Sequence, residues 1–137
     1  MMPDNFDVYQ FLHAVIQQNA EEMRSFFEPD AQIFWSNTKE IFTVDEYIRV
    51  NCEYPDKWSG EIERVDVIEG YEKRMVFVAR VWNTEGCSYH SVSFIEFGEA
   101  ENELIQYLDE YWSDVTGPPE WRQKMKVGKI MDYKAVR

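Results

Sequence analysis

The chain has 137 residues, of which 45% are hydrophobic and 16% aromatic, a composition that excludes disorder and allows one domain with a single core. Its 26 acidic and 14 basic side chains give a net charge of −12, which argues against binding to nucleic acid or to an anionic membrane. No apolar run approaches the ~20 residues of a membrane span, and the acidic N-terminus lacks the features of a signal peptide. We therefore expect a cytoplasmic protein.

The first apolar segments have helical spacing. We expect a first helix as far as about residue 18, capped by Asp4 or Asn5. Asn19 and Glu22 have the spacing of a capping box and predict a second, shorter helix directly after the first.

Residues 31–42 predict two short strands around a turn at 37–39. Thr43 and Glu46 form a second capping box and predict a third helix, which must end before Pro55.

Beyond the third helix the apolar period changes to two. Four strands are expected near residues 58–69, 74–83, 87–97 and 103–112. The links between them have turn length, so consecutive strands must be antiparallel. The predicted order is α-α-β-β-α-β-β-β-β, an α+β fold with helices on one face of a sheet.

Some stretches of the sequence resemble one known superfamily. Residues 19–31, NAEEMRSFFEPDA, resemble its step from the second helix into the first strand. Residues 94–97, 104–105 and 110–112 resemble its last hairpin. On these stretches and on the element order over about residues 5–122, the chain resembles the NTF2-like superfamily, in particular its SnoaL-like and ketosteroid-isomerase-like members.

The resemblance implies a cone, in which a strongly bent, mostly antiparallel sheet wraps around the N-terminal helices. It implies a single domain over residues 1–137, with residues 117–137 as a C-terminal tail. The ligand pocket would lie on the concave side of the sheet. The convex side is where such proteins often form homodimers, and we expect a homodimer here through Val92 and Phe94, which would otherwise leave an apolar patch exposed.

The isomerase-like members have a carboxylate base on the first strand and a Tyr and a protonated Asp as oxyanion donors. Alignment with the family puts Trp35 in place of the base, Phe11 in place of the Tyr and Ser93 in place of the Asp. All three positions depart from the pattern. A steroid-isomerase mechanism is therefore not expected.

Strand alternation predicts which side chains face the pocket if Ser93 does. On its own strand these are Tyr89, Ser91, Ser93, Ile95 and Phe97. On the neighbouring strands, the alignment with the family implies Val76, Val78, Arg80 and Trp82, and Leu104, Gln106, Leu108, Glu110 and Trp112. Apolar walls with a few converging polar groups are typical of a site for a small apolar or aromatic organic molecule.

Two interpretations of Arg80 and Glu110 remain open. Glu110 could have a raised pKa in an aromatic pocket and act as acid or base, with Arg80 holding a substrate carboxylate or a developing enolate. The two could also form a buried ion pair that is needed only for the fold.

Trp112 and Trp121 flank Gly117-Pro118-Pro119, whose fixed backbone would turn the chain away from the sheet. The tail could then cross the mouth of the cone, with Trp121 covering it. Packing of both rings in the core or in a dimer is the alternative.

The sequence has no metal-ligand spacing, no CxxC pair and no nucleotide-binding glycine motif, so no metal and no cofactor are expected. The predicted function is binding of a small molecule in a SnoaL-like domain, and one hypothesis is that the domain is a cofactor-free isomerase, cyclase or dehydratase that works by proton transfer. Glu110 would be the acid or base, Arg80 and Ser93 the polar stabilisers. The ligand would contact Trp35, Trp82, Tyr89, Ser91, Trp112 and Trp121. The alternative is a non-catalytic binding or protein-interaction module.

Overall fold

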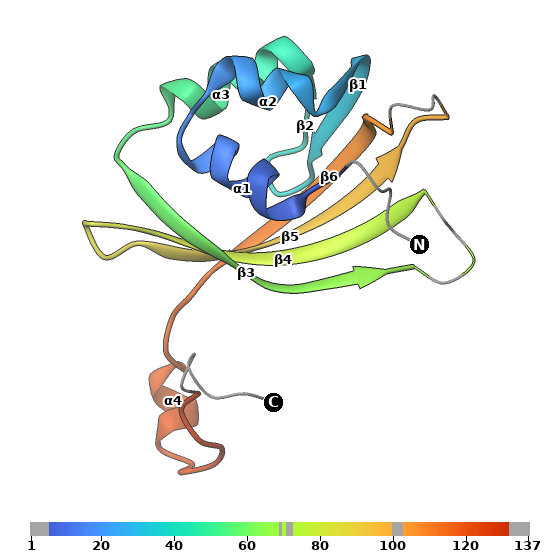
Figure 1. Ribbon diagram of the computed structural model, residues 1–137. Coiled ribbons are helices and arrows are strands. Elements are labelled where there is room, and N and C mark those ends of the chain that lie inside the picture. Colours follow the sequence, from blue (N-terminus) through green and yellow to red (C-terminus); the bar gives the residue numbers. More distant parts are fainter. Residues whose placement is uncertain (1–5, 69, 71–72, 100–102, 132–137) are drawn as a thin grey trace.

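In the computed structural model, which describes residues 6–68, 70, 73–99 and 103–131, three helices lie in the hollow of one curved sheet (Figure 1). The elements are α1 Val8–Ile16, α2 Ala20–Ser25, β1 Phe27–Trp35, β2 Glu40–Thr43, α3 Val44–Glu53, β3 Trp58–Val67, β4 Arg74–Asn83, β5 Ser88–Phe97, β6 Ile105–Asp114 and α4 Glu120–Gln123. The predicted order of the first nine elements is confirmed.

The helices begin where side chains satisfy their free backbone N–H groups. Asp7 caps α1, with Oδ1 accepting from the backbone N of Tyr9 at 2.9 Å. The predicted caps Asp4 and Asn5 lie outside the described residues. The predicted cap of α2 is confirmed, because Asn19 accepts from the backbone N of Glu22.

The capping box of α3 is confirmed in full. The backbone N of Thr43 donates to Oε1 of Glu46 at 2.9 Å, and the backbone N of Glu46 donates to Oγ1 of Thr43 at 3.2 Å. This box fixes the start of the helix that carries Tyr47 to the cavity described below.

The sheet has the strand order β2-β1-β6-β5-β4-β3. The consecutive strands β3 to β6 are antiparallel, as predicted, whereas β1 and β6 are parallel. Glu110 on β6 therefore has Trp35 of β1 on one side and Ser93 of β5 on the other. Segments far apart in the sequence meet at this position.

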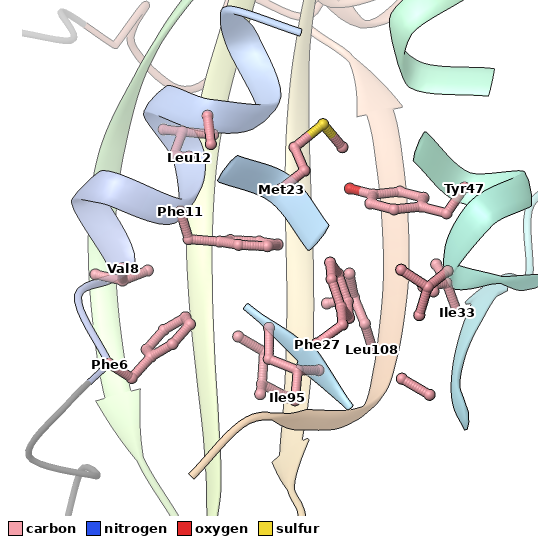
Figure 2. Packing of buried hydrophobic residues seen from close by; sticks show 14 of the residues in the cluster. Phe6, Val8, Phe11, Leu12, Met23, Phe27, Ile33, Tyr47, Ile95 and Leu108 are labelled. Atoms are coloured by element: carbon pink, nitrogen blue, oxygen red, sulfur yellow. The ribbon is translucent and has the colours of Figure 1, made fainter. Parts of the chain in front are cut away.

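The core fills one end of the cone. Figure 2 shows aromatic and aliphatic side chains from α1, α3 and the sheet packed together, including Phe6, Phe11, Phe27, Ile95 and Leu108. The ring of Phe11 lies 5.3 to 6.2 Å from those of Phe26, Phe27 and Phe77, in edge-to-face contacts. The other end of the same strands lines a cavity.

Candidate functional site

A cavity of about 360 Å³ opens between the helices and the concave face of the sheet. It is lined by Phe11, Leu12, Val15, Ile16, Gln18, Trp35, Thr38, Tyr47, Asn51, Tyr54, Trp58, Phe77, Ala79, Val81, Tyr89, Ser91, Glu110 and Trp112. The volume is in the range of small-molecule sites, and the wall is mostly apolar with few polar groups, as in such sites.

Glu110 is the polar centre of this cavity. The hydroxyl of Ser93 donates to its Oε2 at 2.9 Å, and the indole Nε1 of Trp35 donates to its Oε1 at 3.1 Å. The phenol of Tyr47 donates to the same carboxyl group. Side chains from β1, α3 and β5 thus hold one carboxyl group of β6 in place.

Burial raises the pKa of Glu110 above its ordinary value of 4.5, and the hydrogen bonds from Ser93, Trp35 and Tyr47 oppose part of that shift. The Glu110 residue as a whole is half-buried, and its carboxyl group is desolvated. Burial, followed by the charge of Glu110 and the hydrogen bond to it, raises the pKa of Tyr47 well above its usual range. Tyr47 therefore remains a protonated donor when Glu110 is ionised.

Several predicted contact residues do line the cavity. Tyr89 and Ser91 face it from β5, as the alternation predicted. Trp35 and Trp112 form adjoining parts of its wall, with ring centroids 5.2 Å apart and planes at 74°. Their positions are confirmed, and their role in binding a ligand stays a prediction.

The prediction for β4 is wrong. It turned toward the pocket Val76, Val78, Arg80 and Trp82. Phe77 stands directly opposite Ser93, and opposite residues of an antiparallel pair share one face of the sheet. The cavity is therefore lined by Phe77, Ala79 and Val81. The prediction placed β4 one residue out of register, which moves every side chain to the opposite face.

Arg80 lies on the outer face of the sheet as a consequence. Its NH2 group is 2.9 Å from Oε1 of Glu61, and its guanidinium lies 4.4 Å above the ring of Trp82. Arg80 therefore neither lines the cavity beside Glu110 nor forms an ion pair with it. The role predicted for Arg80 is wrong in both interpretations, whereas the raised pKa predicted for Glu110 is found. Trp82 is on the same outer face and is not a wall of the cavity.

The predicted inward set on β6 is correct only for its second half. Leu108 is buried, and Glu110 and Trp112 line the cavity. An irregularity in the pairing with β5 sets Ile105 opposite Phe97 and buries it, so Leu104 and Gln106 do not continue the inward set.

The predicted lid does not form. α4 stands away from the cone (Figure 1), and Trp121 is 64% exposed and does not line the cavity. Pro118 and Pro119 do turn the chain away from the sheet as predicted, but the tail, described as far as residue 131, continues outward and does not cross the mouth.

Besides Phe77 on β4, the site contains three aromatic residues that were not predicted from the sequence, Tyr47, Tyr54 and Trp58. Tyr47 could have been found from the sequence, because it lies on the apolar face of a predicted helix and a buried phenol there requires a hydrogen-bond partner. Trp58 begins β3 and lies 5.5 Å from the ring of Tyr89, a contact that local sequence patterns do not reveal.

Within the described ranges, no three His, Cys, Asp or Glu side chains are grouped so that they could hold a metal ion. Over the same part of the chain, no helix is long and apolar enough to cross a membrane.

No protein-family profile and no curated protein sequence match this chain. Solved structures do match it. A candidate ketosteroid isomerase from Kribbella flavida has a TM-score of 0.73 and 18% identity over 91% of this chain and 87% of its own. An NTF2-like protein of unknown function from Burkholderia xenovorans has a TM-score of 0.69 and 18% identity over 90% of this chain and 92% of its own.

An LEH-like epoxide hydrolase from M. tuberculosis is a third such structure, with a TM-score of 0.60 and 9% identity over 77% of this chain and 79% of its own. The order of elements, the bent sheet and these likenesses show that the chain has the NTF2-like α+β fold, as the resemblance predicted.

Proposed function

We propose that the chain binds a small, largely apolar organic molecule in the Glu110 cavity and moves a proton to or from it without a cofactor. The observation that carries this proposal is the desolvated carboxyl group of Glu110 at the wall of a cavity of about 360 Å³. A carboxyl group with a raised pKa exchanges its proton closer to neutral pH than an exposed one and so suits acid–base work.

The surrounding donors support this role for Glu110. Ser93, Trp35 and Tyr47 fix both oxygens of the carboxyl group, so the proton acceptor is oriented before a ligand enters. Ser93 acts on Glu110 and not as an oxyanion donor to the ligand, because its hydroxyl is engaged by Oε2. The reaction classes that fit are isomerisation, cyclisation and dehydration.

A second candidate function is binding without chemistry. It is favoured by the position of Arg80 on the outer face, because the described lining residues then include no cationic side chain that could stabilise a developing enolate. Non-catalytic binding in the same cavity requires only the shape and polarity already described.

Deuterium exchange distinguishes the two functions. Enolisable cyclic ketones would be incubated with the protein in D₂O, and loss of their α-proton signals would be followed by NMR. Proton transfer by Glu110 predicts a faster rate of exchange with the wild type than with Glu110→Gln. The variant Asp109→Asn, which changes the adjacent residue on the outer face, should exchange at the wild-type rate. Equal rates for the wild type and Glu110→Gln would leave the binding function only.

A further inference from the structure

The Glu110 cavity contains a buried acidic group without a basic neighbour. Among the described lining residues, none is Lys, Arg or His, and Glu110 is the one carboxylate. Buried charges in proteins are normally paired or bind an ion of opposite sign. The cavity provides hydrogen bonds to Glu110 from Ser93, Trp35 and Tyr47, but no opposite charge.

The wall around this carboxylate is aromatic. The rings are those of Phe11, Trp35, Tyr47, Tyr54, Trp58, Phe77, Tyr89 and Trp112. Trp35 and Trp112 meet edge to face, as do Tyr54 and Trp58. Ring faces carry partial negative charge and attract cations.

We propose that the ligand of this cavity is a small organic cation, a substituted amine or quaternary ammonium compound, whose charge lies between Glu110 and the aromatic rings. The inference rests on the proposed function only in taking this cavity as the ligand site. The apolar substituents of such a ligand fit the apolar wall, and its positive charge supplies the partner that Glu110 lacks.

The hydrogen bonding of Glu110 agrees with a cationic ligand. A carboxylate has about four acceptor positions, and the three donors leave room for one contact from a ligand. All three partners donate to Glu110, an arrangement that favours its ionised form. The net charge of −12 also raises the local concentration of cations around the protein.

Anionic and neutral ligands fit less well. An anion would meet the uncompensated charge of Glu110. A neutral molecule would leave the carboxylate without a counter-charge, or would require it to be protonated. The other titratable groups that line the cavity are the phenols of Tyr47, Tyr54 and Tyr89, and burial raises the pKa of Tyr47 and of Tyr89. Asp114, close to Tyr89, adds a further negative charge on that side.

A pair of isosteric probes tests the inference. Isothermal titration calorimetry would compare (3-hydroxyphenyl)trimethylammonium with 3-tert-butylphenol, which has nearly the same shape and no charge. The cation should bind the wild type about tenfold more tightly or better. This advantage should fall severalfold in Glu110→Gln, which keeps only the attraction of the rings, and should persist in Asp109→Asn, which removes one negative charge from the outer face.

The pH dependence of the wild type gives a second test that needs no variant. Below neutral pH, where the phenols of both probes stay protonated and the ammonium group has no proton to lose, the affinity of the cation should rise with pH as Glu110 ionises, whereas the affinity of 3-tert-butylphenol should not rise. Equal affinity of the two probes, or a cation advantage that Glu110→Gln keeps, would overturn the inference and leave the proposed binding site intact. Binding of neither probe at millimolar concentration would overturn both.

Discussion

Trp35 and Glu110 stand opposite each other in the parallel pair of β1 and β6, and the indole Nε1 of the first donates to Oε1 of the second at 3.1 Å. Ser93 stands opposite Glu110 on the other neighbouring strand and donates to Oε2. The register of three adjacent strands therefore sets the geometry of the cavity's polar centre.

Trp35→Phe should raise the pKa of Glu110 further, because it keeps an aromatic ring and removes a hydrogen bond that lowers this pKa. Carbon-13 NMR of labelled glutamate carboxyl groups measures the change. Trp112→Phe is the matched control, since Trp112 lines the same cavity and is not among the donors to the carboxyl group. A midpoint in Trp35→Phe equal to or below that of the wild type would contradict the assigned role of the indole.

Ser93→Ala should destabilise the fold at neutral pH by about 1 to 3 kcal/mol, since it leaves a buried carboxylate with one donor fewer. Urea unfolding measures this loss. Ser91→Ala, two residues along the same face of β5, should cost less. The difference in free energy of unfolding between the two variants should become smaller at acid pH, where Glu110 is protonated in both. A difference that does not change with pH would mean that Ser93 matters for packing alone.

Glu110 should make the free energy of unfolding decrease with pH over a defined range. Its pKa is raised by folding, so between 4.5 and the folded-state pKa the folded chain holds more protons than the unfolded chain. In this window the free energy of unfolding falls as pH rises. Glu110→Gln removes that fall, so its stability relative to the wild type should increase through the window and then level off. A relative stability that is flat or decreases with pH would show that the pKa is not raised.

Trp121→Ala should change neither ligand affinity nor stability beyond about 0.5 kcal/mol. Its ring is exposed and lies outside the cavity lining. Calorimetry with the cationic probe and thermal unfolding together test this. A clear loss of affinity would mean that the tail closes over the mouth when a ligand is bound.

We propose that the outer face of the sheet pairs with a second copy of the chain. Phe94 and Tyr111 meet edge to face there at 6.1 Å and are 42% and 44% exposed, and Val92 lies directly opposite Tyr111. Val92→Glu combined with Phe94→Glu should give a folded monomer, with sedimentation velocity and circular dichroism as the measurements. A wild type that is monomeric at micromolar concentration would refute this proposal.

Local signals in the sequence were sufficient for most of the fold. The Thr43–Glu46 capping box predicted the start of α3 because both partners lie within one helical turn. Alternation on β5 predicted the cavity residues Tyr89 and Ser91 because that strand pairs regularly from Tyr89 to Glu96. Glu110 was found by applying the family alignment and alternation to residues 104–112, and the structure places it opposite Ser93.

The failures have a common physical cause, which is dependence on contacts distant in sequence. The pairing register between β4 and β5 determines on which face of the sheet Arg80 lies. The alternation of residues within β4 is compatible with either register, so it could not reveal that face. The irregularity between Glu96 and Phe97 reverses the start of β6. The Pro118-Pro119 motif predicts a turn, but it does not specify the direction in which the exposed tail continues.

Titration of Glu110 by carbon-13 NMR, in the free protein and with (3-hydroxyphenyl)trimethylammonium, would decide whether this residue is the desolvated centre of a ligand cavity. Burial predicts a midpoint above 4.5 in the free protein. A bound cation stabilises the ionised form and should move that midpoint down. A midpoint at the ordinary value that the probe does not change would contradict both the desolvation of Glu110 and its contact with a ligand.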